Sequence, residues 1–152
     1  MKQTTLWIII NCDKILLCMK KRGFWEWLWN WAGWKLEEWE TIKQAMIREL
    51  EEETCLKSKE QDLQDYGVLH FFFEKDPNFN QDINLFLIEK IQWEPTETEE
   101  MKPEWFDIEK IPYDKMWDDD IIWLPRVLKW EKVEYNFWFW IDWKIKKHEK
   151  IK

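Results

Sequence analysis

The stretch WKLEEWETIKQAMIRELEEETCL, residues 34–56, carries the clearest helix signal of the chain. Apolar side chains recur along it at helical spacing, which predicts one buried face. These side chains are Ile42, Ala45, Met46 and Leu50. Thr41 precedes them and can cap the first turn with its hydroxyl oxygen. Glu49, Glu52 and Glu53 stand at positions i, i+3 and i+4, so their carboxylates share a second face of the same helix.

This carboxylate face needs neutralisation, because like charges at such spacing repel by roughly a few tenths of a kcal/mol per pair. Water and counterions can neutralise it on a solvated face, which is the usual situation for a bare acidic run. Bound divalent cations can do so as well, since carboxylate oxygens are ligands that Mg²⁺ and Ca²⁺ accept. The spacing of the neighbouring residues favours the cations.

Five residues separate Trp34 from Glu40, and seven more separate Glu40 from the run RELEEE at residues 48–53. With glycine read at Trp34, this spacing resembles the Nudix box. That motif runs glycine, five residues, Glu, seven residues, Arg-Glu-aliphatic, one residue, Glu-Glu, one residue, glycine and an aliphatic residue. Seven fixed positions over 23 residues match, and the two departures are the glycine positions, at Trp34 and Cys55.

The resemblance extends over the chain from about Thr5 to the C-terminal strand. The strings MKKRGF, EEMKPEWF and IPYDKMW, followed by two aspartates before Trp123, stand in the order found in MutT-type Nudix enzymes. Those enzymes hydrolyse oxidised purine nucleoside triphosphates, such as 8-oxo-dGTP, to the monophosphate and pyrophosphate and so sanitise the nucleotide pool. The resemblance implies an α+β Nudix fold, a mixed β-sheet sandwiched by helices, in a single domain over residues 1–152.

The same resemblance implies a divalent cation, Mg²⁺ with Mn²⁺ as the alternative, on the carboxylate face. The implied metal ligands are the main-chain carbonyl of Gly33 and the carboxylates of Glu49, Glu52, Glu53 and Glu100. These four carboxylates are also the candidate catalytic groups, and the general base stays open between Glu53, Glu52 and Glu100. Glu40 and Arg48 are expected to form an ion pair that orients the helix.

A second group of residues is expected to bind the substrate. Trp117 can stack on a purine, and Asn30, Asp119 and Asp120 can exchange hydrogen bonds with its polar edge. The full set implied by the resemblance is Thr5, Lys20, Phe24, Asn30, Phe71, Phe73, Trp117, Asp119 and Asp120. Two ordinary explanations compete here: a surface role for Lys20, and plain core positions for the two strand phenylalanines. Asp118 replaces a proline that is usual in this subfamily.

The remaining elements are predicted from apolar patterning. Two β-rich runs flank the turn at Asn11 and Asp13, two more flank a polar turn with Pro77, and a second helix contains Pro125. The predicted strands cover residues 4–10, 14–21, 66–74, 82–92 and 132–141, with a short strand within 96–112, and the second helix covers 118–130. Strands and helices do not alternate regularly, which favours a mixed sheet.

Tryptophan and glycine counts are abnormal, because the chain has 15 Trp and 3 Gly, whereas average usage of about 7% predicts roughly 11 Gly in 152 residues. Nine tryptophans stand on glycine positions of the resemblance or in turn-like contexts. They are Trp25, Trp27, Trp31, Trp34, Trp39, Trp93, Trp130, Trp140 and Trp143. UGA encodes tryptophan in some genetic codes and glycine in others. We therefore hypothesise that these nine residues are glycine in the living protein. Trp7 and Trp138 stay undecided, and Trp29 stands on a family tryptophan.

Composition limits the setting and the partners. The net charge of −8 argues against binding a nucleic acid polymer, so the expected partner is a small-molecule nucleotide bound by a monomer. A membrane-interface anchor or a stacking platform for single strands would need basic residues that the tryptophan-rich stretch lacks. The apolar run at residues 6–10 is too short for a signal peptide or a membrane span. Three scattered cysteines fit a reduced, cytoplasmic protein.

Two alternative functions remain open at this point. The chain could be a Nudix hydrolase of another nucleoside diphosphate derivative, or a Nudix-fold binding module without catalysis. The complete set of Arg48, Glu49, Glu52 and Glu53 argues against an inactive module, whereas Cys55 at a usual glycine position argues weakly for one.

Overall fold

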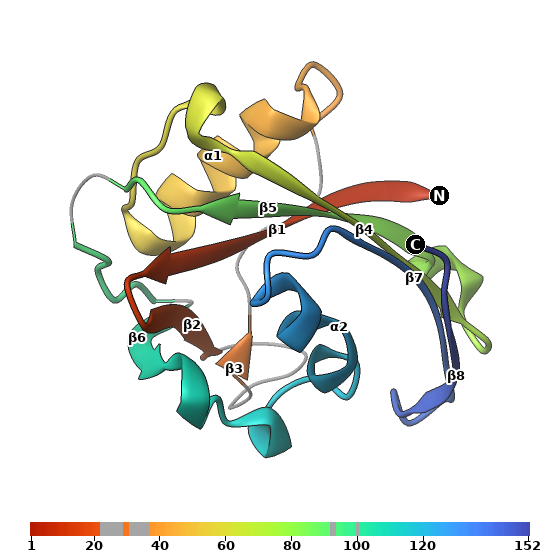
Figure 1. Cartoon of the computed structure of the whole chain (residues 1–152). Coiled ribbons are helices and arrows are strands. Elements are labelled where there is room, and N and C mark those ends of the chain that lie inside the picture. The colour runs from red at the N-terminus through yellow and green to blue at the C-terminus, as the bar shows by residue number, and fades with distance from the viewer. Residues whose placement is uncertain (22–28, 31–36, 92–93, 100) are drawn as a thin grey trace.

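A computed structural model of the chain describes residues 1–21, 29–30, 37–91, 94–99 and 101–152, with Lys20, Trp29 and Asn30 described by their backbone alone (Figure 1). The strands are β1 (Lys2–Asn11), β2 (Lys14–Lys20), β3 (Trp29–Asn30), β4 (Gln64–Phe73), β5 (Gln81–Ile88), β6 (Met101–Asp107), β7 (Val133–Phe139) and β8 (Ile145–Lys150). The α-helices are α1 (Ile42–Thr54) and α2 (Asp120–Val127). Short 3₁₀ turns cover Glu60–Asp62, Pro77–Phe79, Ile108–Lys110 and Tyr113–Lys115.

The strands form one mixed sheet in the order β3-β2-β1-β5-β4-β7-β8, and β6 pairs with β2. The pairs β1–β5 and β4–β7 are parallel, and the other pairs are antiparallel. The mixed sheet predicted from the order of the elements is therefore confirmed.

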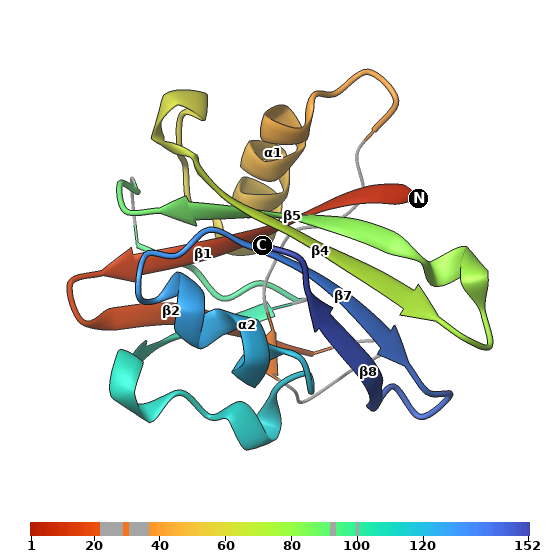
Figure 2. The ribbon, with the colours of Figure 1, turned by 45° about the vertical axis from the view of Figure 1, so that its right-hand side comes forward.

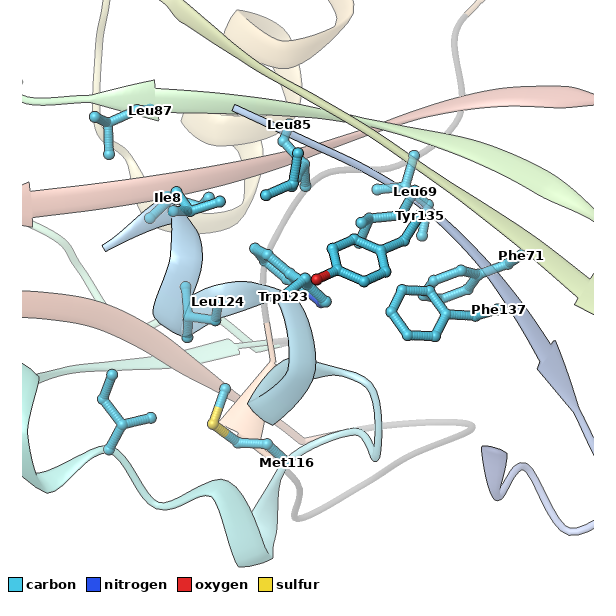
Figure 3. Packing of buried hydrophobic residues seen from close by; sticks show 14 of the residues in the cluster. Ile8, Leu69, Phe71, Leu85, Leu87, Met116, Trp123, Leu124, Tyr135 and Phe137 are labelled. Carbon is cyan, nitrogen blue, oxygen red and sulfur yellow. The ribbon is translucent and has the colours of Figure 1, made fainter. Parts of the chain in front are cut away.

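The two helices cover opposite faces of the sheet (Figures 1 and 2). Alternate residues of each strand point to opposite faces, so β1 contributes to two cores. Trp7 and Ile9 pack in the cluster that contains Met46 and Leu50 of α1. Ile8 and Ile10 belong to the cluster that contains Trp123 and Leu124 of α2, and Figure 3 shows Trp123 directed toward Leu85 and Tyr135 of the sheet. No helix among the described residues is long and apolar enough to cross a membrane.

Helix α1 begins and ends as its sequence predicts. The Thr41 hydroxyl accepts a hydrogen bond from the Gln44 N–H at 3.2 Å, and the Gln44 side chain accepts from the Thr41 N–H at 2.9 Å. This reciprocal capping box satisfies two donors of the first turn. At the other end Cys55 has φ 64°, the left-handed conformation that glycine usually supplies after a helix. The helix therefore ends at the expected glycine position, although a cysteine stands there.

Two strands were not expected from the sequence. The strand predicted over 132–141 corresponds to β7 but does not end the fold, because β8 follows it at the sheet edge. The β8 sequence, IKKHEK, is polar and mostly exposed, so it lacks the apolar alternation that marks a strand. The two-residue strand β3 lies inside the tryptophan-rich stretch and is too short for any periodicity.

Gly67 in β4 is the one described position where the backbone requires glycine for space. Its φ is +113°, and an added Cβ would lie 1.7 Å from the Val133 carbonyl oxygen of β7. Because that oxygen belongs to the parallel β4–β7 pairing, it cannot move away without breaking the ladder.

We therefore expect Gly67→Ala to lower the free energy of unfolding by at least about 2 kcal/mol, as measured by urea denaturation. Gln64→Ala, at an exposed position of the same strand, serves as the control and should change it by less than about 0.5 kcal/mol. Equal effects of the two substitutions would contradict the steric interpretation.

Candidate active site

A bidentate ion pair joins the loop before α1 to the helix itself. Arg48 donates from Nε to Glu40 Oε2 at 2.7 Å and from a terminal nitrogen to Glu40 Oε1 at 2.9 Å. The Glu40 side chain is only 2% exposed. The Arg48 guanidinium holds the pKa of Glu40 below its ordinary value, and the Glu40 carboxylate raises the pKa of Arg48. Both groups therefore stay charged at neutral pH and fix the approach of the loop to the helix.

Arg48 also contacts two carboxylates of the acidic face. Its other terminal nitrogen donates to Glu49 Oε1 at 2.8 Å and to Glu52 Oε2 at 3.2 Å. The Glu49 side chain is 12% exposed and that of Glu52 is 58% exposed. The Arg48 guanidinium thus neutralises part of the negative charge on this face and reduces the repulsion between its carboxylates.

One carboxylate oxygen of Glu53, Oε2, is buried, whereas the side chain of Glu52 is 58% exposed. Burial raises the pKa of the Cys18 thiol in β2, and the Glu53 charge adds to this effect.

The donor chemistry of this face fits a hard divalent cation. Carboxylate oxygens suit Mg²⁺ or Mn²⁺, whereas Zn²⁺ prefers His and Cys ligands. Gly33 and Glu100, the other predicted ligands, lie outside the described residues. Among the residues that the structure does describe, no three His, Cys, Asp or Glu side chains converge as a metal-holding group. The metal site thus stays a prediction for Glu49, Glu52 and Glu53.

The loop at residues 94–99 is tied to the end of α1. The Thr96 N–H donates to the Thr54 carbonyl at 2.9 Å, and the Thr98 hydroxyl donates to the Glu53 carbonyl at 3.3 Å. The sequence pointed only to Glu100 in this region. Thr98 carried no signal, because its role rests on a contact with a residue 45 positions away.

An aromatic group lies on the opposite face of the sheet. Phe71 and Phe73 of β4 are 3% and 5% exposed and belong to the core cluster of α2. The Trp117 ring stacks on Phe71, with centroids 6.2 Å apart and an interplanar angle of 26°. Phe71 and Phe73 therefore occupy core positions, the ordinary explanation, and Phe71 also carries the stacked Trp117 ring.

The predicted aspartates are buried beside this aromatic group. Asp119 is 2% exposed and accepts a hydrogen bond from Trp123 Nε1 at 2.8 Å. Burial raises the pKa of Asp119 to about 7, although the Trp123 bond opposes the shift. Its other oxygen, Oδ1, has no hydrogen-bond partner among the described residues. Asp120 is equally buried, and its charge adds to burial in raising the pKa of Tyr113 to about 12.

Asp118, which departs from the subfamily proline, has a structural role. Its carboxylate accepts a hydrogen bond from the Ile145 N–H at 3.0 Å. This bond ties the segment before α2 to the start of β8.

The remaining predicted residues are placed less completely. Thr5 is 1% exposed, but strand alternation puts it on the face of Trp7 and Ile9, so the structure does not bring it together with Phe71. Lys20 and Asn30 lie on β2 and β3, and their side chains are outside the described part of the chain. Phe24 lies outside it entirely.

Comparison with known families and proteins identifies the family of the chain. A sequence profile of the NUDIX domain matches residues 1–127. The chain belongs to the NUDIX family. An oxidized purine nucleoside triphosphate hydrolase of Danio rerio is 41% identical to it over 128 residues, 84% of this chain and 80% of the relative. A Mus musculus protein of the same name is 38% identical over 135 residues, 89% and 85% of the two chains.

Solved structures confirm the Nudix fold predicted from the motif. A MutT protein from Bacillus halodurans superposes on this Nudix chain with a TM-score of 0.86 and covers 99% of it, with 98% of that protein matched. The sequence identity is 22%, so this likeness concerns the fold alone. The α+β class and the mixed sheet between helices are those expected from the sequence.

We expect Glu40→Gln to lower the free energy of unfolding by about 1–2 kcal/mol at pH 7, because it removes a charge-assisted bidentate pair. The folded-state pKa of Glu40 lies below its unfolded value of about 4.5. The contribution is therefore fully present above that value and disappears as the pH falls through the lower folded-state pKa. Urea denaturation at pH 7 and near pH 3 measures this difference.

Glu38→Gln, two residues away and exposed, is the matched control and should be neutral at both pH values. A Glu40→Gln effect that persists undiminished near pH 3 would show that its cause is packing rather than charge.

Proposed function

We propose that this Nudix protein hydrolyses oxidised purine nucleoside triphosphates, such as 8-oxo-dGTP, to the monophosphate and pyrophosphate. The observation that carries the proposal is the buried Asp119 beside the Trp117–Phe71 stack, with one carboxylate oxygen that has no hydrogen-bond partner among the described residues. A purine edge offers the hydrogen bonds that such an atom needs. The names of the two relatives support the same class of substrate.

Base recognition is assigned to Trp117, Asp119 and Asp120, together with Asn30 and Phe24. The pKa of Asp119, about 7, allows its carboxyl group either to accept or to donate a hydrogen bond at neutral pH. A buried carboxylate oxygen without a hydrogen bond, such as Asp119 Oδ1, costs free energy, and a bound purine with a complementary N–H or oxygen would remove this cost. Unmodified purines present a different edge, so the site can discriminate against them.

The phosphates are assigned to the α1 face. Mg²⁺ or Mn²⁺ would be held by Glu49, Glu52, Glu53, Glu100 and the Gly33 carbonyl. Lys20 would contact the triphosphate. When bound, such a cation neutralises phosphate charge and makes a coordinated water more acidic. The Glu40–Arg48 pair orients the helix, and Glu52, Glu53 or Glu100 takes the proton of the attacking water. The water oxygen bonds to one phosphorus as the P–O bond to the bridging phosphoanhydride oxygen breaks, and that oxygen leaves with the second product.

The setting that we propose is a reduced cytoplasm with the chain as a monomer. Cys12, Cys18 and Cys55 are all unbridged, and Cys18 is buried in the core of α1. A reducing compartment keeps such thiols free.

Pyrophosphate release from 8-oxo-dGTP and dGTP, measured with and without Mg²⁺, tests the proposal. The assay uses the glycine-restored form, defined as the full chain with glycine at the nine tryptophan positions named above. We expect the oxidised nucleotide to be preferred. Glu53→Gln should lower kcat by at least about 100-fold, whereas Glu51→Gln, an exposed carboxylate of the same helix, should leave it unchanged.

Three outcomes separate the candidate functions. Hydrolysis without preference for the oxidised base would favour another nucleotide substrate. Nucleotide binding without hydrolysis would indicate a non-catalytic module. Equal kcat losses for the Glu51 and Glu53 variants would remove the assigned role of Glu53.

A further inference from the structure

Thr98 joins three segments that are distant in the sequence. Its hydroxyl donates to the Glu53 carbonyl at 3.3 Å and accepts from the Met101 N–H of β6 at 3.1 Å. Its N–H donates to the Met101 carbonyl at 2.9 Å, and its own carbonyl accepts from Lys21 Nζ at 3.0 Å. Lys21 also forms an ion pair with Glu97. The end of β2, the last turn of α1 and the start of β6 are therefore linked through one residue.

The bond to Glu53 matters because carbonyl groups in the last turn of a helix have no partner within the helix. Thr98 satisfies the carbonyl of Glu53, the residue whose carboxylate oxygen Oε2 is buried. The Thr96 N–H satisfies its neighbour, the Thr54 carbonyl, at 2.9 Å. The last turn of α1 is thus held from outside by the loop at residues 94–99.

We propose that Thr98 is a positioning residue for the cation site, which it serves by fixing the backbone of Glu53 against the loop and β6. This inference rests on the proposed function only in taking Glu53 as a cation ligand. Groups that orient metal ligands without touching the metal affect affinity by about 10–100-fold.

Mn²⁺ binding measured by electron paramagnetic resonance, without nucleotide, tests the role of Thr98 in the glycine-restored form. Thr98→Val keeps the shape and removes the hydroxyl, and we expect Mn²⁺ to bind about tenfold more weakly. Thr98→Ser retains the hydroxyl and should restore binding to within about twofold of the parent. Lys21→Met removes the donor to the Thr98 carbonyl and so loosens the same loop. We expect it to weaken Mn²⁺ binding by less than Thr98→Val does.

Parent-like Mn²⁺ binding by Thr98→Val, or binding by Thr98→Ser as weak as that of the valine variant, would overturn the role. Were the valine variant unfolded, parent-like binding by Lys21→Met would overturn it as well. Because the measurement contains no nucleotide, it is independent of whether 8-oxo-dGTP is the substrate.

A separate observation concerns the tryptophans. Trp130 has φ 67° and Trp143 has φ 65°, the left-handed region that bulky residues rarely occupy. Trp7 and Trp123, which are fully buried, are not among the positive-φ residues. Left-handed backbone therefore occurs at two of the nine positions hypothesised to be glycine and at no other described tryptophan.

Trp130 occupies the glycine position of a Schellman motif after α2. The Glu131 N–H donates to the Arg126 carbonyl at 3.0 Å, and the Trp130 N–H donates to the Val127 carbonyl at 2.9 Å. This pair of bonds defines the motif, whose left-handed residue is usually glycine. The Trp130 side chain is 57% exposed, so packing does not explain its presence there.

Trp143 occupies the glycine position of a hairpin turn between β7 and β8. Its N–H donates to the Trp140 carbonyl at 3.0 Å, and the Trp140 N–H donates to the Lys144 carbonyl at 2.8 Å. A tight turn followed by one left-handed residue is a common three-residue hairpin loop, and that residue is typically glycine.

We infer that Trp130 and Trp143 are glycine in the natural protein, encoded by UGA. The codons of the source gene test this directly. UGA is expected at both positions and at the other seven of the nine, with UGG at Trp7 and Trp123. UGG at Trp130 or Trp143 would overturn the inference.

Thermal denaturation gives a second test that does not depend on the gene. We expect Trp130→Gly to raise the Tm by roughly 2 °C, because it relieves left-handed strain. Trp138→Gly is the control: this tryptophan lies inside β7 and stacks on Phe72 at 5.4 Å, so its loss should lower the Tm. A Tm decrease for Trp130→Gly like that of the control would contradict the inference. Trp143 is left to the codon test, because its ring also packs 4.7 Å from Phe73.

Discussion

Strands β1 and β5 bury side chains on both faces, so the sheet is stable only with a cover on each side. Helix α1 supplies one cover through Met46 and Leu50, and α2 supplies the other through Trp123 and Leu124. The same two-sided arrangement also separates the candidate cation ligands from the candidate base-binding residues. The carboxylates proposed for the cation stand on the first helix, whereas Asp119 and Trp117 stand at the start of the second. In the proposed function, phosphate and base recognition thus belong to different layers of the same core.

The two layers differ in how their polar groups are satisfied. On the α1 side the charges are paired with one another, since Arg48 contacts Glu40, Glu49 and Glu52 at once. On the α2 side burial dominates, and it raises the pKa of Asp119 to about 7. Because three carboxylates face one guanidinium on the α1 side, a triphosphate would bind there only with a divalent cation between them. The aromatic surroundings of Asp119 suit the purine of the proposed substrate.

Local patterns predicted what local forces determine. The helix at Ile42–Thr54 follows from Thr41, the apolar spacing and the acidic face, and the strand pairs flanking Asn11 and Pro77 follow from turn residues. Features set by distant partners were missed. β8 exists because β7 offers it an edge, and Thr98 matters only through Glu53. The sequence likewise did not show which face of the sheet Thr5 points to, because the elements that pack on β1 decide which of its two faces meets which core.

The first strand of the chain lies in the middle of the sheet and pairs in parallel with β5, where Lys2 is opposite Gln81. A nascent chain therefore exposes the apolar run of β1 long before its permanent neighbour has been synthesised. Only the hairpin with β2 can form early, and that pairing is confined to Ile10–Ile15 and Asn11–Lys14. Non-local parallel pairing of this kind makes folding slow. During translation a strand that is buried on both faces in the finished protein is therefore exposed to aggregation.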